Sequence, residues 1–455
     1  MRYISTRGQS PSASFDDVLT TALAPDGGLF VPEHYPAPLK LEADASFADI
    51  SAAILHAFAE GDMSRDEAAA MTREAYATFR HPQTTPVVGI GGHPVLELFH
   101  GPTLAFKDVA MQLLARLFER SLKRSGRTMQ VIVATSGDTG GAAVASLAGR
   151  EGVKLCVLHP YGRISEVQRR FMTTHPADNI LNLALEGTFD DCQSIVKALF
   201  ADRSFADEVS LGGVNSINWA RIAAQVTYYF AACQAVGQGP VHFSVPTGNF
   251  GDIFAGWVAK KLGAPVGMLI VAVNDNDILH RALTTGDYDK RGVKPTVAPS
   301  MDIEVASNFE RAIFEVSGRD AELTAGLLAD LKTKGNFTLP PSLKRSLSEE
   351  FMSARAGEAE INEVIGRLHR DTGTLIDPHT AIGISAAEQA RANGLEGPIV
   401  TLATAHPAKF PEAVEAASGE HPALPIANDD LYNRQERFSV LTATEEAVKK
   451  AIRSA

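Results

Sequence analysis

The stretch VIVATSGDTGGAAVASLAGREGVKLCVLHP (131–160) indicates the fold class. It opens with an apolar run, passes through a glycine-rich loop into small residues suited to a helix, and closes with a second apolar run. We therefore predict a strand, a loop, a helix and a second strand. Apolar strands that alternate with helices are typical of parallel sheets whose two faces are covered by helices.

The same order of segments recurs twice further along the chain. VHFSVPTGN (241–249) precedes a helical pattern and the apolar run PVGMLIVAVN (265–274). PIVTLATAHPAKF (398–410) leads from a strand into a helix that we expect to begin near Pro411. We therefore predict an α/β protein with two parallel-sheet domains.

A chain of 455 residues is too long for a single hydrophobic core, and we expect three parts. Residues 46–60 and 64–81 are alanine-rich and amphipathic, and Ser64 and Glu67 have the spacing of a helix capping box. The expected parts are a mainly helical N-terminal region over 1–94, a smaller α/β domain over 95–210, and a larger α/β domain over 211–455 with a helical insertion near 321–370.

Composition excludes several classes of function. The chain carries 42 Lys and Arg against 54 Asp and Glu, a formal net charge of −12, so nucleic acid and anionic membranes are poor partners. We find neither a run of eighteen apolar residues nor a secretory signal at the start, and we expect a cytoplasmic protein. The three cysteines lack metal-site or disulfide spacing. Because no heptads or apolar dimer stripe are visible, we expect a monomer or a weak homodimer.

The loop PTGNFGD (246–252) is the best candidate for a phosphate site. Gly248 and Gly251 would let the backbone approach an anion closely, and the helix that follows offers its positive end. The alternative is a tight turn between a strand and a helix. The loop matches neither the P-loop nor the dinucleotide pattern, so we expect a phosphorylated ligand smaller than a dinucleotide.

Lys107 lies in the segment LELFHGPTLAFKDVAMQLLARLF (96–118), where a helical pattern starts near Phe106. The positive end of a helix and the apolar neighbours of this lysine would both lower its pKa. A neutral amine is what Schiff-base chemistry requires. The alternative is a solvated lysine paired with Asp108.

The loop ATSGDTGGAA (134–143) surrounds glycines with hydroxyl groups and one carboxylate at a predicted helix start. Hydroxyls and free backbone N–H groups in that arrangement suit a carboxylate ligand. The alternative is that Ser136 or Asp138 only caps the helix.

The segment NSINWAR (215–221) places Asn215, Ser216 and Arg221 around the start of an apolar helix. An arginine with such neighbours suits an anion clamp. The alternative is a capped helix with a surface arginine. Histidines near turns show no ligand spacing, so no metal site is predicted, and the serine-nucleophile pattern G-x-S-x-G is missing.

Taken together, these segments resemble the threonine synthases of the longer bacterial and fungal kind, which are pyridoxal-phosphate enzymes of the tryptophan-synthase-β fold type (fold type II). The resemblance runs through most of the chain. It rests on YISTRG (3–8), APDGGLFVP (24–32), HGPTLAFKD (100–108), ATSGDTG (134–140), NSIN (215–218), PTGNFGD (246–252), MDIEVASNFER (301–311), DPHTA (377–381) and LATAHPAKF (402–410).

The resemblance implies a role for each candidate residue. Lys107 resembles the lysine that binds pyridoxal phosphate covalently, and Thr404 resembles the hydroxyl residue that faces its pyridine nitrogen. Asp138 stands where the wider fold type has an asparagine beside the cofactor 3′-oxygen, and a carboxylate there would share a proton with that oxygen or be repelled by it. The residues resembling those that hold the cofactor phosphate are Gly248, Asn249, Phe250, Gly251 and Asp252. Those resembling substrate-binding residues are Thr135, Ser136 and Thr139 for the α-carboxylate and nearby phosphate, and Asn215, Ser216 and Arg221 for the substrate phosphate.

The implied reaction converts O-phospho-L-homoserine and water into L-threonine and phosphate by γ-elimination and β-addition of water, the last step of threonine biosynthesis. Lys107 is expected to carry protons in several steps, and the smaller domain is expected to close on the larger. Two alternatives remain open. One is a related enzyme such as a serine/threonine dehydratase or an O-acetylserine-dependent cysteine synthase, and the other is a related protein that binds cofactor or phosphorylated ligands without turnover.

Overall fold

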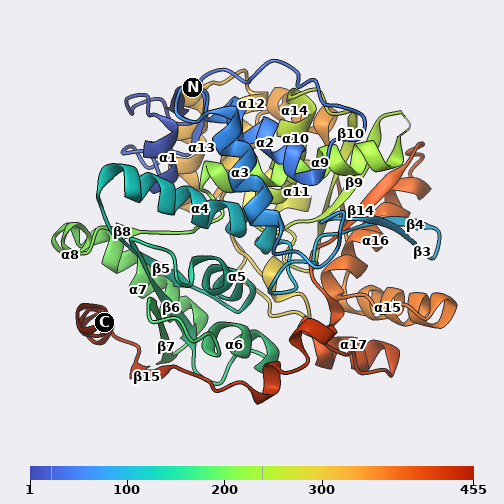
Figure 1. Cartoon of the computed structure of the whole chain (residues 1–455). Coiled ribbons are helices and arrows are strands. Elements are labelled where there is room, and N and C mark those ends of the chain that lie inside the picture. Colours follow the sequence, from blue (N-terminus) through green and yellow to red (C-terminus); the bar gives the residue numbers. More distant parts are fainter. Residues whose placement is uncertain (22, 238) are drawn as a thin grey trace.

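The computed structural model describes residues 1–21, 23–237 and 239–455 and has two parallel sheets, each packed against helices (Figure 1). This confirms the predicted α/β class with two parallel-sheet domains and a helical N-terminal region. No helix in the described part of the chain is both long and apolar enough to cross a membrane.

The larger sheet has six strands, and all neighbours run parallel except the last pair. In spatial order its strands are β13 (Phe351–Arg355), β10 (Val266–Val273), β9 (Val241–Pro246), β14 (Ile399–Ala403), β4 (His93–Glu97) and β3 (Val87–Ile90). The smaller sheet has five parallel strands, β15 (Ser439–Thr442), β7 (Ile180–Glu186), β6 (Val153–Pro160), β5 (Met129–Ala134) and β8 (Leu211–Gly212). All strands predicted from apolar runs are present, and the helix expected near Pro411 is α17 (Pro411–Ser418).

The N-terminal region contains a small antiparallel pair, β1 (Tyr3–Ser5) with β2 (Phe30–Pro32), and the helices α1 (Phe15–Thr21), α2 (Phe47–Phe58) and α3 (Arg65–Tyr76). The Ser64 hydroxyl accepts a hydrogen bond from the backbone N–H of Glu67, as predicted. The Glu67 carboxylate does not complete the capping box, because it pairs with Arg120 of α4 (Lys107–Ser125) at 2.6 Å. Half of the predicted box therefore serves to tie α3 to α4.

The segment 321–370 was predicted to be helical, and it also contains two strands. Its helices are α13 (Ala321–Lys334), α14 (Pro341–Glu350) and α15 (Glu358–Thr372). Between them, β12 (Asn336–Thr338) pairs with β11 (Asp287–Asp289), and β13 forms the edge of the larger sheet beside β10. Phe351 and Ala354 of β13 are buried in the edge of this sheet. The strand was not predicted because the residues on both sides of it have a helical pattern.

The remaining helices cover the sheets and connect the strands. They are α5 (Asp138–Leu147), α6 (Glu166–Thr173), α7 (Phe189–Ala201), α8 (Arg203–Glu208), α9 (Trp219–Val236), α10 (Gly251–Lys261), α11 (Ile278–Thr284), α12 (Phe309–Val316), α16 (Pro378–Ala392) and α18 (Glu445–Ser454), with short 3-10 turns η1 (Pro299–Met301), η2 (Pro407–Lys409), η3 (Ile426–Asn428) and η4 (Leu431–Asn433).

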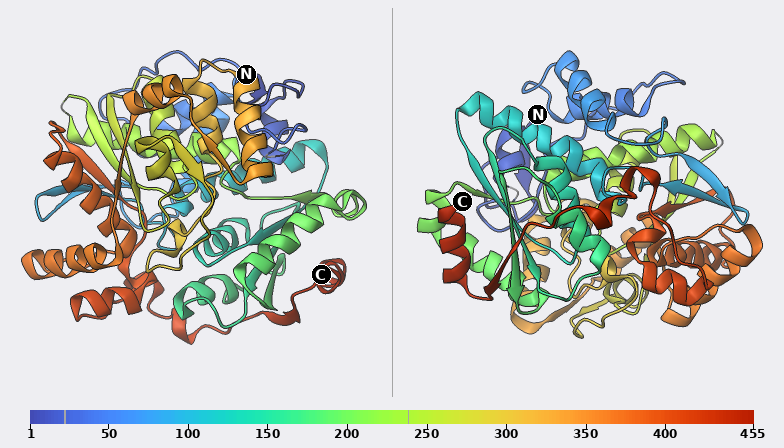
Figure 2. Two further views of the ribbon diagram at one scale, coloured as in Figure 1. Left: turned by 180° about the vertical axis from the view of Figure 1, so that it is seen from behind. Right: turned by 60° about the horizontal axis from the view of Figure 1, so that its bottom comes forward.

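Each sheet draws on distant parts of the chain. The strands β3 and β4 join the larger sheet although they precede the smaller one, and β15 joins the smaller sheet after the larger one is complete. The chain consequently passes between the sheets three times, after β4, after β8 and after β14. Figure 2 shows the last crossing, in which the red C-terminal segment returns to the smaller sheet. The domain limits expected at 94 and 210 stay a prediction.

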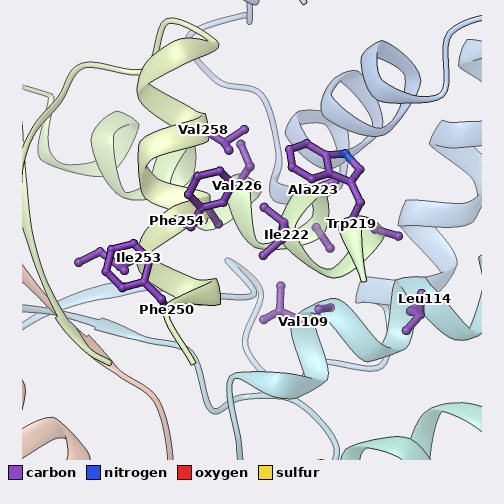
Figure 3. Close-up of a cluster of buried hydrophobic side chains, with 14 of the residues drawn as sticks. Val109, Leu114, Trp219, Ile222, Ala223, Val226, Phe250, Ile253, Phe254 and Val258 are labelled. Carbon is purple, nitrogen blue, oxygen red and sulfur yellow. The ribbon is translucent and has the colours of Figure 1, made fainter. Parts of the chain in front are cut away.

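The helix α9 packs against both α4 and α10, and all three contribute to one apolar cluster. Figure 3 shows Val109 of α4 beside Ile222 of α9, and Phe254 of α10 beside Val226. A Cβ placed on Gly251, the first residue of α10, would lie 3.6 Å from Ile222. This packing fixes the starts of the helices that carry three of the predicted site segments.

Candidate active site

Lys107 is the first residue of α4, and a turn of unusual shape delivers it. Leu104 adopts a left-handed backbone with φ of 63°. The N–H of Phe106 donates to the carbonyl of Thr404 at 2.8 Å, and the N–H of His406 donates to the carbonyl of Leu104 at 3.0 Å. The turn that precedes Lys107 is thus hydrogen-bonded to the loop after β14, and these bonds hold Thr404 close to the start of α4.

Asp108 is not the partner of Lys107. Its buried carboxylate accepts the N–H of Thr103 at 2.7 Å and the Thr103 hydroxyl at 2.8 Å. Burial raises the pKa of Asp108 to about 6, against the hydrogen bonds from Thr103. The alternative of a solvated lysine paired with Asp108 is therefore wrong, and Asp108 instead holds the lysine loop in shape.

The ammonium group of Lys107 lies 3.3 Å from Asp138, the first residue of α5. The Lys107 side chain is only 12% exposed. Burial lowers its pKa, the Asp138 carboxylate opposes that shift, and the positive charges of Arg221 and Lys409 add to it. The pKa is thus lowered as the sequence predicted, with burial as the largest cause.

Asp138 is held by several partners and does not cap its helix, whose N-cap is Gly137. One carboxylate oxygen lies 3.0 Å from Nζ of Lys409, and the other accepts the Ser300 hydroxyl at 3.2 Å. Burial would raise the pKa of Asp138, but the charges of Lys409 and Lys107 outweigh it and bring the pKa well below its usual range.

Lys409 is the most prominent residue that the sequence reasoning missed. Its side chain is fully buried, donates to the Thr103 carbonyl at 3.0 Å and lies 4.8 Å from the centre of the Phe171 ring. A lysine six residues after an apolar strand was a weak signal, since nothing local shows that it is buried. Ser300 offered no signal, because the long loop that carries it has no motif.

The loop 248–252 has the shape of an anion cradle. Phe250 adopts a left-handed backbone with φ of 64°, and its ring packs in the core. A Cβ on Gly248 would lie 2.7 Å from the Ser300 carbonyl, so only glycine fits there. Among the described residues, the backbone N–H groups from Gly248 to Asp252 have no recorded acceptor. Unpaired N–H groups at a helix start are the donors that a phosphate requires.

Two further side chains shape this loop. Asn308, which the sequence reasoning also missed, donates through its side chain to the carbonyls of Asn249 and Ser216, both at 3.2 Å. Asp252 turns away from the N–H groups and accepts the Tyr228 and Tyr229 hydroxyls. Burial raises the pKa of Asp252 to about 6, against those two hydrogen bonds.

In the loop after β5, one hydroxyl group holds the backbone turn and two others are free to bind a ligand. The Thr135 hydroxyl accepts the N–H groups of Gly137 at 2.9 Å and Gly140 at 3.0 Å, so it fixes the turn. Ser136 and Thr139 are half-buried, and no hydrogen bond of either side chain is recorded within the described residues. These two hydroxyls are the ones available to a ligand.

Arg221 is buried without an acidic partner among the described residues. Its side chain is 4% exposed, one Nη donates to the Val214 carbonyl at 2.9 Å, and Nε has no acceptor. Burial lowers its pKa to about 10. The alternative of a surface arginine is therefore wrong. Asn215 is exposed and Ser216 is half-buried at the same loop.

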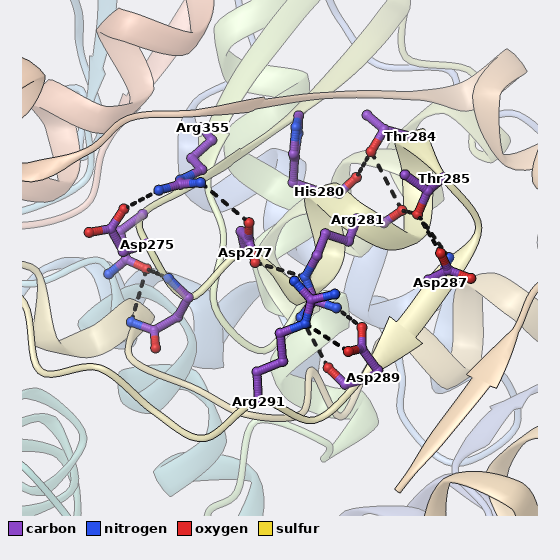
Figure 4. A network of polar contacts seen from close by, with 12 residues as sticks. Asp275, Asp277, His280, Arg281, Thr284, Thr285, Asp287, Asp289, Arg291 and Arg355 are labelled. Carbon is purple, nitrogen blue, oxygen red and sulfur yellow. Dashed lines mark hydrogen bonds and ion pairs between the residues drawn. The ribbon is translucent and has the colours of Figure 1, made fainter.

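A network of ion pairs holds the segments next to the loop that carries Ser300. Figure 4 shows Arg281 between Asp277 and Asp289, with Arg355 reaching Asp275 and Asp277. These ion pairs tie the segment after β10 to β11 and β13, and so support the neighbouring loop from 290 to 302.

Comparisons with known proteins match most of the chain. Family models match as "Threonine synthase N terminus" over residues 2–76, "Pyridoxal-phosphate dependent enzyme" over 84–330 and "Threonine synthase, C-terminal" over 380–452. A threonine synthase of Pseudomonas aeruginosa is 48% identical over 97% of this chain and 96% of that protein. The crystal structure of pyridoxal-phosphate-bound threonine synthase from Brucella melitensis is 47% identical with a TM-score of 0.96, covering 100% of this chain and 99% of that one. The yeast threonine synthase structure is 38% identical with a TM-score of 0.94, covering 99% and 98%.

Proposed function

The chain belongs to the threonine synthase family of pyridoxal-phosphate-dependent enzymes, and from this premise we propose how its own residues convert O-phospho-L-homoserine and water into L-threonine and phosphate. The activity is that of a carbon–oxygen lyase. The proposal concerns which residues bind, orient and move protons.

The residues present fit pyridoxal phosphate. The unpaired N–H groups from Gly248 to Asp252 would hold its phosphate, and Lys107 would hold it covalently through an amine whose pKa burial lowers. Thr404 would face the pyridine nitrogen with a hydroxyl, which leaves that nitrogen neutral. When bound there, the cofactor supplies an electron sink that favours loss of the substrate Cα proton.

The single observation that carries the substrate assignment is Arg221. A buried guanidinium with an unpaired Nε is costly unless an anion completes its surroundings. Its charge also acts on Lys107, so it lies within electrostatic reach of the amine. A phosphate ester on the substrate would satisfy Arg221, with Asn215 and Ser216 at the same loop, whereas serine would not.

The loop after β5 offers hydroxyl donors for the substrate carboxylate. We assign it to Ser136 and Thr139, whose side chains are half-buried and unengaged. Thr135 supports them indirectly, because its hydroxyl fixes the turn. Nζ of Lys107 takes the Cα proton and holds it for a later step, since its lowered pKa favours the neutral amine that a base must be.

A combined assay tests the proposal. The purified protein should show the visible Schiff-base absorbance band and should release phosphate and threonine from O-phosphohomoserine, while Lys107→Ala should abolish both. A colourless wild type, or phosphate release that Lys107→Ala leaves unchanged, would contradict the assignment. Formation of 2-oxobutanoate from threonine without reaction of phosphohomoserine would indicate a dehydratase, and colour without turnover would indicate a binding protein.

Three expectations from the sequence stay predictions. They are a cytoplasmic location, a monomer or weak homodimer, and closure of the smaller domain on the larger. Crystals with and without ligand test the last one, because identical angles between the domains would contradict it.

A further inference from the structure

Asp138 is the only carboxylate recorded in an ion pair with either lysine of the candidate site, within the part of the chain that the structure describes. Lys107 approaches it from α4 at 3.3 Å, and Lys409 approaches it from η2 at 3.0 Å. A single negative charge thus lies between two ammonium groups. Arg221 adds a third positive charge that acts on Lys107.

We propose that Lys409 is a positioning residue that holds the Asp138 carboxylate and takes most of its charge, so that Lys107 is left as a neutral amine. The inference rests on the proposed role of Lys107 as cofactor lysine and base. It adds a residue that touches neither the reacting carbon nor the substrate phosphate, and that acts only through Asp138 and through its own charge.

The geometry decides which of the two lysines gives up its proton. Lys409 forms an ion pair with the Asp138 carboxylate and donates a hydrogen bond to the Thr103 carbonyl, both at 3.0 Å. Lys107 has one recorded acceptor at the longer distance of 3.3 Å. In a buried site the better-bonded ammonium keeps its charge, and the repulsion between the two charges is relieved by deprotonating the other.

The groups that face this cluster from other elements do not change the balance. Around Asp138, Ser300 and Gln168 are neutral donors, and His379 acts only at longer range while its own ring nitrogen pairs with Asp377 at 2.8 Å. Around Lys107, Asp252 of α10 is a second carboxylate within electrostatic reach, but no ion pair joins it to the amine among the described residues, and the Asp108 carboxylate lies within electrostatic reach of Lys409.

Without Lys409, the Asp138 carboxylate would form an ion pair with Lys107 alone. An isolated lysine–carboxylate pair in a buried site favours both charges strongly, and the lysine would then remain protonated near neutral pH. The proposal therefore predicts a direction: removal of the Lys409 charge raises the pKa of Lys107.

The test measures the protonation of Lys107 directly. Full-length protein freed of cofactor is labelled with limiting acetic anhydride across a pH series, and acetylation of Lys107 is quantified by mass spectrometry. In Lys409→Met the pH midpoint of labelling should rise by about one unit or more, the size of shift that a nearby charge produces. Lys409→Arg should restore the wild-type midpoint, and Lys260→Met, which removes a lysine paired with Glu350 instead, should leave it unchanged.

An unchanged midpoint in a folded Lys409→Met protein would overturn the proposal. If circular dichroism shows that this variant does not fold, Asp138→Asn probes the same arrangement: the midpoint of Lys107 must then fall, and a rise or no change would overturn it equally. Turnover is not part of the readout. A wild type that is inactive on phosphohomoserine but shows these shifts would contradict the proposed function and not this inference.

Discussion

The buried arginines Arg221 and Arg311 differ in how completely the protein satisfies their hydrogen-bond donors. Replacing each with methionine therefore distinguishes a ligand-binding role from a structural one. Burial lowers the pKa of both Arg221 and Arg311 to about 10. Arg311 donates to the Phe30 carbonyl twice and to the Ile217 carbonyl, and it also reaches the Asn308 side chain. Arg221 donates to one carbonyl and leaves Nε unpaired.

The expected effects on the free energy of unfolding have different sizes. A pKa lowered to about 10 corresponds to roughly 3 kcal/mol by which burial disfavours the charged arginine. In Arg221→Met that cost disappears and one charge-assisted hydrogen bond, worth about 1.5–3 kcal/mol, is lost, so the unliganded protein should be as stable as wild type or slightly more so. In Arg311→Met the same burial cost disappears, but four charge-assisted bonds are lost, so the protein should be destabilised by about 3 kcal/mol or more.

Urea unfolding of cofactor-free protein, which cannot turn the substrate over, with and without saturating phosphohomoserine measures both effects. A ligand at about 100 times its Kd stabilises the folded state by roughly 2.7 kcal/mol. Wild type and Arg311→Met should show this gain, whereas Arg221→Met should bind 10- to 100-fold more weakly, as expected for about 1.5–3 kcal/mol from a charge-assisted bond. If Arg221→Met is strongly destabilised and ligand protects it as well as wild type, Arg221 is structural and the reasoning fails.

Two further substitutions test the loops around the amine. Gly248→Ala should weaken cofactor binding at least tenfold in a fluorescence titration, because its Cβ would lie 2.7 Å from the Ser300 carbonyl. Gly326→Ala is the control, since a Cβ on this residue of α13 would meet open space, and it should leave cofactor binding unchanged. Equal effects of the two substitutions would contradict the steric explanation. In the folded protein the pKa of Asp108 is raised to about 6, so ionisation of this group disfavours the folded state. Wild type should keep its full stability below about pH 4 and lose part of it as the pH rises to about 6. Relative to Asp108→Asn, wild type should therefore lose about 3 kcal/mol across this window in urea unfolding, and a difference that does not change with pH would refute the assignment.

The predictable part of the site was the part with local signals. Glycines at a strand end mark a place where backbone must bend or approach a ligand, which is why Gly248 and its loop were found. Lys107 was found because an apolar helix start is an unusual place for a lysine. In both cases, residues that give the site its backbone shape or help to lower the lysine pKa are close to it in the sequence as well as in space.

The missed residues act through contacts between distant segments. Lys409 meets Asp138 and Thr103, and Asn308 joins the carbonyls of Ser216 and Asn249. No local pattern shows that these side chains are buried or what they face. The same reason hid the pairing of β13 and β15, because a short strand is recognisable only by the partner that it finds.

The three passages of the chain between the two sheets have a mechanical consequence. The passage after β4 contains Lys107, the passage after β8 contains Arg221, and the passage after β14 contains Lys409. Any rotation of one sheet against the other must be absorbed in these connections, since they alone join the sheets through the backbone. Lys107, Arg221 and Lys409 therefore lie in these connections, and a rotation of one sheet against the other would change the spacing between the amine and the Arg221 guanidinium group.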